Sequence, residues 1–511
     1  MKPTTATAAP ARAGRREWTG LAVLALPTLL LALDVSVLYL ALPQVSADLG
    51  ADGNQTLWIL DIYSFVLAGF LVTMGTLGDR IGRRRLLLIG AAAFGGASVL
   101  AAYSTSAEML IATRALLGLA GATLMPSTMA LIRNMFPDPK QMGTAIGIWF
   151  TCFMGGMAIG PLVGGALLER FWWGSAFLLG VPFMALLLVV GPALLPEYRA
   201  PGAGRLDLAS VGLSLAAILP AIYGLKELAR AGWDPAAAGA VVVGLAFGLI
   251  FVRRQRSLAD PLLDLRLFGY RAFRSALSVY LLTGVVMAGV SLMSTVYLQS
   301  VLELSTLRAG LWLLPHNVAL AAGFLAAPRL AARFRPVYVM AAGMVVAAAG
   351  LALHLLVDPS DGTTPLVAGL VLAHAGISLP MALSANIIMG AAPPEKAGSA
   401  ASLMETSAEF GIAMGVATLG TVGTVMYRGS FEAPAAIPAQ AAEAARESIT
   451  AAGGAAAGLP PAPAAELLHA AQAAFTTGVN AVGAIGAAVF VVLAVIIYRA
   501  DRGTGTSEKI R

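Results

Sequence analysis

Apolar residues form long, continuous runs from one end of the chain to the other, separated by short charged or glycine-containing segments. Each run has about twenty residues, the length that an α-helix needs to cross the hydrocarbon core of a bilayer. Polar and apolar positions do not alternate within the runs, so helices are expected rather than the strands of a barrel. The pattern predicts an all-α integral membrane protein.

About fourteen such spans are predicted from the runs and the charges between them. Lys226, Glu227 and Arg230 separate the seventh span from the eighth. Residues 428–472, before the last span, are rich in Ala, Pro and Gly, and residues 439–448 within them suit a short helix. The predicted spans are residues 18–42, 57–78, 86–103, 109–132, 141–166, 175–195, 207–225, 236–252, 273–298, 308–330, 337–357, 365–390, 399–427 and 473–498.

The positive charges follow a topology pattern. Most of the 33 Lys and Arg residues lie at the two termini and in every second loop, and Lys and Arg in short loops mark the cytoplasmic side of a membrane protein. Both termini are therefore expected in the cytoplasm, in a bacterial inner or plasma membrane. The net charge of +6 follows from this arrangement and does not indicate a nucleic-acid partner.

Composition and motifs narrow the class of function. The chain is 58% hydrophobic and 12% charged, whereas about a quarter of a soluble domain is charged. It contains no G-x-x-x-x-G-K-[ST] or H-E-x-x-H pattern, and its one cysteine, Cys152, lies within a predicted span. We therefore expect neither an enzyme nor an ATP-driven pump, and no cofactor, metal site or internal disulfide.

One loop carries a patterned cluster of glycine and charge. Between the second and third spans the sequence reads G-T-L-G-D-R-I-G-R-R-R. Glycines permit a tight turn and close helix approach, and Asp79 is able to cap a helix or pair with an arginine across the turn. An ordinary positive cytoplasmic loop would not need the spacing G-x-L-x-D-R-x-G-R-R. The residues of this motif are Gly75, Gly78, Asp79, Arg80, Gly82, Arg83 and Arg84.

This loop resembles the signature loop of the major facilitator superfamily. Over nearly the whole chain, the sequence is similar to the fourteen-span drug:proton antiporters of the QacA, SmvA and LfrA type. Besides the loop, the resemblance rests on residues 33–43, 57–64, 112–118, 173–175 and 404–411. It implies proton-coupled antiport that exports bulky lipophilic or cationic compounds, such as quaternary ammonium biocides, dyes and antibiotics. Export of one self-made antibiotic or metabolite stays open, and proton symport is a weaker alternative.

The resemblance also implies a domain organisation. Two six-helix bundles are expected in residues 18–200 and 257–498, with a cavity between them and two inserted helices in residues 201–256. The ends, residues 1–17 and 499–511, are expected to be cytoplasmic tails, and residues 428–472 an outer loop. The expected working form is a monomer driven by the proton gradient, whose partners are small molecules, protons and the bilayer.

The fifth span carries a glycine stripe. Gly156, Gly160 and Gly164 share one helical face, and Pro161 removes a backbone hydrogen bond. By itself such a stripe is typical of close helix packing. In the family that the chain resembles, this is the antiporter motif, which here also includes Gly165. The resemblance implies export by exchange, with a stiff seam that closes the inner half of the protein against leak.

Charged residues inside spans are candidates for function, because a buried charge costs roughly 2.5–3.5 kcal/mol on insertion scales. Asp34 lies in the outer half of the first span, where it caps no helix. Asp61 lies near the outer start of the second span. It either faces one outward cavity together with Asp34 or is a helix N-terminal residue that water satisfies. Arg114 is expected to pair with a carboxylate or with helix carbonyls. The resemblance links its position to proton coupling, and a structural salt bridge is equally open.

Two further acids share one face of the thirteenth span. Glu405 and Glu409 are four residues apart, so their side chains are neighbours on a helix. Two close carboxylates repel each other, and apolar surroundings favour the neutral form, so at least one is expected to bind and release protons near neutral pH. Without the proton, the same site would attract an organic cation. An interfacial position is the alternative for Glu405.

Aromatic side chains near the acidic positions form a possible surface for flat cations. Most aromatic residues in membrane helices serve packing or the interfacial belt. The tenth span carries His316 and Asn317 but no acid, which puts a preference for dications in doubt. The aromatic candidates are Tyr39, Trp58, Tyr63, Trp149, Phe150 and Trp312.

Overall fold

The computed structural model describes residues 12–51, 53–199, 207–231, 233–258, 261–393 and 396–504. These residues contain helices and no strands, and fourteen of the helical spans are long and apolar enough to cross a membrane. The predicted all-α membrane fold is confirmed.

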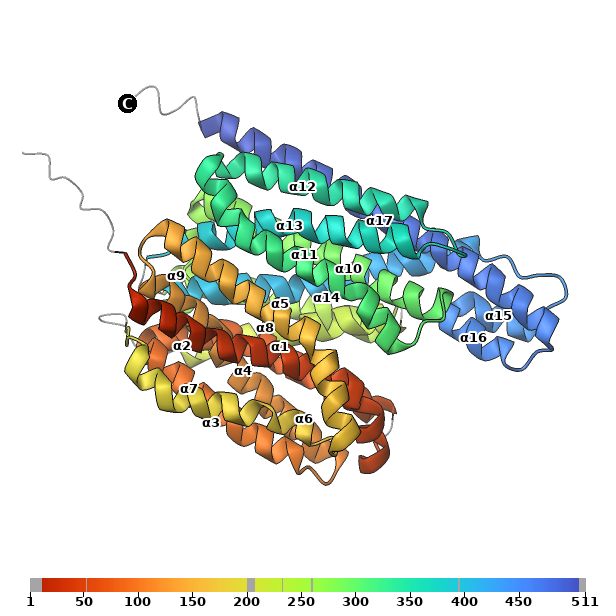
Figure 1. The fold of residues 1–511 in the computed structure, drawn as a ribbon, viewed down its shortest axis with the longest axis horizontal. Helices are drawn as coiled ribbons and strands as arrows, with labels where there is room; N and C mark the ends of the chain where they lie inside the picture. The colour runs from red at the N-terminus through yellow and green to blue at the C-terminus, as the bar shows by residue number, and fades with distance from the viewer. Residues whose placement is uncertain are drawn as a thin grey trace, which may run out of the picture. The chain divides into compact units, whose positions relative to one another are not determined.

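The helical elements follow one another with short connections (Figure 1). Three spans are made of two helical elements each: α6 leads into α7, the π-helix η2 extends α10 and the 3-10 helix η3 extends α12. The elements are α1 (Arg15–Leu49), α2 (Gly53–Ile81), α3 (Arg83–Ala102), α4 (Ala107–Met135), α5 (Pro139–Arg170), α6 (Ser175–Leu178), α7 (Gly180–Leu194), α8 (Leu208–Ala231), α9 (Pro235–Ser257), η1 (Leu265–Gly269), α10 (Arg271–Val296), η2 (Tyr297–Val301), α11 (Thr306–Arg333), α12 (Pro336–Ala352), η3 (Leu353–Leu356), α13 (Thr363–Ala391), α14 (Ala397–Ser430), α15 (Ala439–Glu447), α16 (Ile449–Ala456) and α17 (Pro461–Thr504).

The segment before the last span is more helical than predicted. The short helix expected at residues 439–448 is confirmed as α15, and α16 follows it directly. Helix α17 begins at Pro461 rather than at residue 473. Hydropathy marks only the apolar part of this helix, whereas its first turns are alanine-rich and begin with proline, both of which favour a helix start.

The end of α8 also differs from the prediction. The helix continues to Ala231, so Lys226 and Glu227 lie in its last turns rather than in a loop. Charged residues near the end of a span are tolerated there because their long side chains reach toward the interface.

Contacts divide the chain into two compact units. Unit 1 comprises Met1–Val211, Gln255–Phe273 and Ala385–Glu405. Unit 2 comprises Gly212–Arg254, Arg274–Ser384 and Thr406–Arg511. Most of the inserted pair α8 and α9 groups with unit 2, and the end of α13 and the start of α14 group with unit 1.

Glycine allows the helices inside each unit to approach closely. In unit 1, a Cβ atom on Gly118 of α4 would collide with the backbone carbonyl of Tyr63 on α2. In unit 2, Gly343 of α12 lies against the backbone of Gly376 of α13, where a Cβ atom would come within 2.6 Å of the carbonyl oxygen. Helix packing in membranes depends on such small residues, because lipid supplies no hydrophobic force between helices.

Candidate functional site

Asp34 and Arg114 form a buried ion pair in unit 1. The Nη1 atom of Arg114 on α4 donates to Oδ2 of Asp34 on α1 over 2.6 Å. The Arg114 side chain is 2% exposed and the Asp34 side chain is 6% exposed. A charge-assisted hydrogen bond this short offsets part of the cost of removing both ions from water.

Arg114 has further partners on α2. Its Nε atom donates to the carbonyl of Ile59 at 3.3 Å, and its guanidinium carbon lies 4.6 Å from the centroid of the Tyr63 ring. The expected pairing of Arg114 with a carboxylate or with helix carbonyls is therefore present in both forms. One side chain joins α4 to α1 and α2, so a change in the charge of Asp34 would act on three helices.

The second acid expected near this pair lies in a different environment. Asp61 on α2 is half-buried, whereas Asp34 is 8% exposed as a residue. Of the two acids, Asp34 is therefore the more deeply buried.

The glycine stripe of α5 lies against α1. A Cβ atom on Gly156 would meet the carbonyl of Leu29 at 2.5 Å, and one on Gly160 would collide with the hydroxyl of Ser36. Gly164 is buried, whereas Gly165 has no atom within 4 Å of its Cβ position. The side chain of Pro161 lies outside the part of the chain that the structure describes. Close packing with α1 therefore explains two of the four motif glycines directly.

The loop between α2 and α3 is built around Arg83. Its side chain is completely buried, pairs with Asp79 one turn earlier and donates from Nη1 to the carbonyl of Gly75 at 2.9 Å. Gly82 between the two helices has φ of 113°, a conformation that suits glycine. The motif is thus a folded turn with a buried ion pair rather than a solvated basic loop.

This turn also contacts the start of α14 within unit 1. A Cβ atom on Gly398 would collide with the Arg83 guanidinium, and one on Gly75 would come within 2.6 Å of the Gly398 carbonyl. Nearby, Nε of Arg133 on α4 donates to the carbonyl of Met389 on α13 at 2.9 Å. These contacts tie the adjoining ends of α13 and α14 to α2, α3 and α4.

Three other residues of the motif have different surroundings. Arg80 is 6% exposed, and Gly78 leaves room for the Arg83 side chain, whose Nη1 would lie 2.8 Å from an added Cβ atom. Arg84 contacts Glu197, with 3.6 Å between Nε and Oε2.

Glu197 is a residue of this region that the sequence did not point to. Its carboxylate accepts from the backbone N–H groups of Arg84 at 3.1 Å and Arg85 at 3.2 Å. These groups open α3, whose preceding residue Gly82 offers no capping side chain. Glu197 therefore supplies the negative charge that a helix start favours. Nothing in the local pattern around Glu197 distinguishes it from another loop acid.

The acids of α14 differ in burial. Glu405 is 7% exposed, and Glu409, one turn further along, is half-buried. In unit 2 the Glu409 carboxylate interacts electrostatically with Lys226 of α8. Sequence reasoning assigned Lys226 to a loop and so missed it as a partner. Burial disfavours the charged carboxylate, and the nearby ammonium group opposes this effect of burial.

Two histidines of unit 2 also form a pair. The rings of His316 on α11 and His374 on α13 lie with their centroids 4.2 Å apart. The Nδ1 atom of His374 is 2.8 Å from the carbonyl of Leu370 and therefore carries a hydrogen, because a carbonyl only accepts. The pair joins α11 to α13, which suits a packing role between the two helices.

The aromatic candidates of unit 1 and unit 2 have different surroundings. Tyr63 covers Arg114, whereas Trp149 is 1% exposed, donates to the Thr128 hydroxyl at 3.2 Å and packs on Phe150 with 5.0 Å between ring centroids. Trp312 of unit 2 is 47% exposed.

The other two aromatic candidates are Trp58 and Tyr39. Trp58 packs toward Phe65, with 6.0 Å between ring centroids, and the side chain of Tyr39 lies outside the described residues.

No group of three or more His, Cys, Asp or Glu side chains within the described ranges is placed to hold a metal ion.

Comparisons with known proteins agree with this architecture. Residues 24–416 match the model of the Major Facilitator Superfamily. The chain is 43% identical to the multidrug efflux pump LfrA of Mycolicibacterium smegmatis over 97% of this chain and 98% of LfrA. It is 36% identical to the methyl viologen resistance protein SmvA of Salmonella typhimurium over 90% of this chain and 93% of SmvA.

A solved structure shares the fold. The human organic anion transporter MFSD10 (TETRAN) is similar with a TM-score of 0.60 and 16% identity, covering 93% of this chain and 99% of that one. At this identity the likeness concerns the fold alone. The family model and the relatives together confirm the resemblance seen in the sequence: the chain belongs to the Major Facilitator Superfamily, in the group of multidrug efflux pumps that includes LfrA and SmvA.

Proposed function

We propose that this protein is a proton-coupled antiporter that exports bulky lipophilic or cationic compounds across a bacterial cytoplasmic membrane. The similarity to LfrA and SmvA over almost their whole lengths supports export. The observation that carries proton coupling is the buried pair of Asp34 and Arg114. A titratable carboxylate held inside a span, against an arginine that touches two other helix segments, links proton binding to helix contacts.

Asp34 is proposed to bind the transported proton in competition with Arg114. When Asp34 is charged, the guanidinium stays bound to it and joins α4 to α1. When Asp34 takes up a proton, the ion pair is lost, and Arg114 keeps only its contacts with Ile59 and Tyr63 on α2. A proton would thus favour a different packing of α1 against α4, and its release would restore the first.

Glu405 and Glu409 are proposed to exchange protons for cargo. Their position one turn apart on α14 disfavours two negative charges at once. Burial of Glu409 favours the bound proton, and Lys226 opposes this effect. Once the proton has left, the charged carboxylate attracts an organic cation. Competition of proton and cargo for the same acids produces exchange, since each ligand must leave before the other binds.

The turn between α2 and α3 is proposed to latch one state of the cycle. The buried Asp79–Arg83 pair and its contact with Gly398 hold the start of α14 within unit 1. Transport would require these contacts to separate and reform, because α14 also carries Glu405 and Glu409. The glycine seam between α5 and α1 would stay closed throughout and limit leak.

The remaining features follow from this proposal. Both termini lie in the cytoplasm, as the distribution of Lys and Arg favours. The protein works as a monomer, without a cofactor, and takes its energy from the proton gradient. Its cargo is a small molecule of the drug-like or cationic kind. The protein binds this cargo and exchanges it for protons, and it does not catalyse a reaction.

Accumulation of ethidium in a pump-deficient bacterial host tests the proposal. Cells that express the protein are expected to accumulate less dye than cells with the empty vector, and collapse of the proton gradient should remove the difference. Asp34→Asn and Glu409→Gln are expected to abolish export. Matched controls are Asp48→Asn, which changes an exposed acid on the same α1 helix, and Glu432→Gln, which changes an exposed acid just after α14.

The alternatives give different results in the same host. Higher accumulation of dye under an inward proton gradient would indicate a symporter. Protection against a single antibiotic, with none against dyes or quaternary ammonium compounds in a resistance panel, would indicate a dedicated exporter. If Asp34→Asn and Glu409→Gln protected as well as the wild type against every compound, the assignment of the coupling acids would be wrong.

A further inference from the structure

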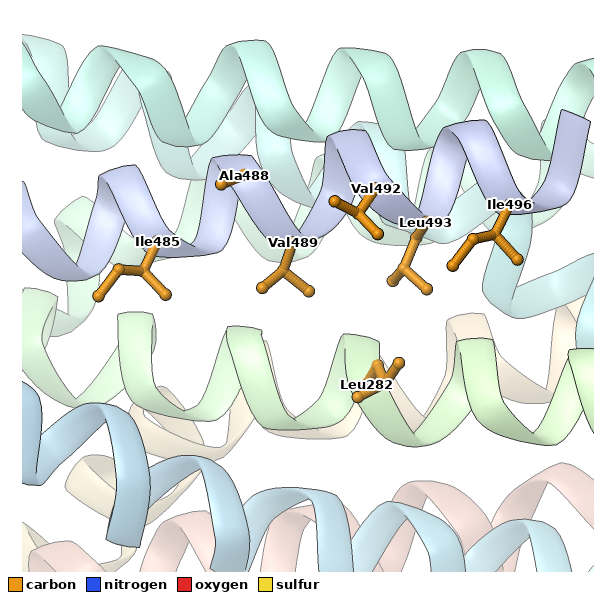
Figure 2. A pocket seen from close by; sticks show the side chains of 7 residues that line it. All are labelled: Leu282, Ile485, Ala488, Val489, Val492, Leu493 and Ile496. Carbon is orange, nitrogen blue, oxygen red and sulfur yellow. The ribbon is translucent and has the colours of Figure 1, made fainter.

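An apolar groove in unit 2 has no part in the proposed exchange. It has a volume of about 320 Å³ and is lined by Leu282 of α10 and by residues of α17 between Ile485 and Ile496. Figure 2 shows Ile485, Val489 and Leu493 of α17 pointing toward the helix that carries Leu282. All of the lining side chains are aliphatic, so the groove suits a ligand that is apolar along its length.

The groove is long and open to the side. From Ile485 to Ile496 helix α17 rises about 16 Å, roughly half of the ~30 Å thickness of the hydrocarbon core. The lining residues Val492 and Ile496 are 56% and 54% exposed, so the groove opens on the outer face of the helices. An extended hydrocarbon chain matches this elongated shape, and its length corresponds to one leaflet of a bilayer.

One end of the groove carries positive charge. Val489, Val492 and Ile496 recur at spacings of three and four along α17, and the next position on this face is Arg499, which is exposed. Gly486 packs against Val286 and Val290 of α10, whereas Leu282 faces later residues of α17, so the two helices run antiparallel.

The antiparallel arrangement brings a second cation to the same end. Arg274 of α10 is exposed and lies eight residues before Leu282, which is about 12 Å along the helix. It therefore lies beyond the end of the groove on the side of Arg499. Arg274 and Arg499 thus follow the apolar lining at the same end of the two helices.

We propose that the groove binds one acyl chain of an anionic membrane phospholipid, whose phosphate is held by Arg499 and Arg274. A guanidinium matches the geometry of a phosphate and binds it through two hydrogen bonds. Basic residues between transmembrane helices recognise anionic headgroups in the same way. A zwitterionic lipid carries its own cation and gains less from these arginines. The site does not depend on the proposed export function.

Native mass spectrometry of the purified full-length protein tests this site. The protein is mixed in detergent with phosphatidylglycerol or phosphatidylcholine of identical acyl chains. The wild type is expected to retain one phosphatidylglycerol molecule at energies that remove phosphatidylcholine. Val492→Trp, which fills the groove, and Arg499→Gln are each expected to lose most of this retention. Val491→Trp is the matched control, because Val491 is 50% exposed and does not line the groove.

The outcomes separate a built site from general lipid contact. Equal retention by the wild type, Val492→Trp and Arg499→Gln would overturn the proposal, as would equal retention of both lipids by the wild type. If ethidium at transport concentrations displaced the retained phosphatidylglycerol from the wild type, the groove would be a cargo site and the proposal would be wrong. Because Arg499 lies near the end of α17, Arg499→Gln gives a result even if Val492→Trp fails to fold.

Discussion

Arg114 and Asp34 hold each other in a place where neither would be stable alone. Their Nη1 and Oδ2 atoms are 2.6 Å apart, and both side chains are almost completely buried. Burying an isolated ion costs several kcal/mol even after the protein relaxes. A proton on Asp34 would remove the ion pair. The pair is therefore suited to couple proton binding to the contacts between helices.

Loss of Arg114 alone should destabilise the protein more than loss of the whole pair. Arg114→Met leaves the Asp34 carboxylate buried without its partner, which is expected to cost about 3–5 kcal/mol. The double variant Asp34→Asn/Arg114→Met removes both charges and should recover most of this loss. Thermal unfolding in detergent measures both. Equal unfolding temperatures for the single and the double variant would show that the pair is not the source of the stability.

The glycine seam of α5 predicts a strong dependence on position. Gly160→Leu places a side chain against Ser36 of α1 and should reduce both stability and ethidium export. Gly165→Leu introduces the same side chain into open space and should leave export near the wild-type level. Both variants are compared at equal expression in membranes. Full export by Gly160→Leu would argue against a role for the closed seam.

Substitution of two arginines in the same loop should affect export differently. Arg83 is completely buried against Asp79 and Gly398, whereas Arg85 is exposed. Arg83→Gln is expected to abolish export because it removes the latch, and Arg85→Gln is expected to keep it. Dye efflux from preloaded cells gives the rate for each. The latch would be refuted by wild-type efflux rates in Arg83→Gln.

Lys226 should influence the pH at which export operates. A carboxylate that loses a neighbouring cation holds its proton to higher pH, so Lys226→Met should move the pH profile of efflux to higher pH. Lys226→Arg keeps the charge and should keep the wild-type profile. The profile is measured in membrane vesicles over a series of buffered pH values. An unchanged profile in Lys226→Met would mean that this ammonium does not act on Glu409.

The spans were predictable from the sequence because length and continuous hydrophobicity are local properties. The same criterion missed the start of α17 at Pro461, where alanine rather than hydropathy favours the helix. It also ended the seventh span too early, because the charges at Lys226 and Glu227 resemble a loop even though the helix continues through them.

The site was predictable in its components but not in its pairings. A charged residue within an apolar run is visible in the sequence. Asp34, Arg114 and the acids of α14 were therefore predicted as functional candidates. The choice of Asp34 as the partner of Arg114 depends on how α1 packs against α4, which no local pattern reveals. Glu197 was missed for the same reason, since its role at the start of α3 arises only when α3 and the end of α7 meet.

Proton release on addition of cargo is the most direct test of the account. Everted membrane vesicles are energised until their interior is acidic, and ethidium is then added while a fluorescent dye reports the internal pH. The wild type and Asp48→Asn are predicted to raise the internal pH as protons leave in exchange for cargo, whereas Asp34→Asn and Glu409→Gln should give no change. An equal rise in internal pH with all four proteins would contradict the central claim.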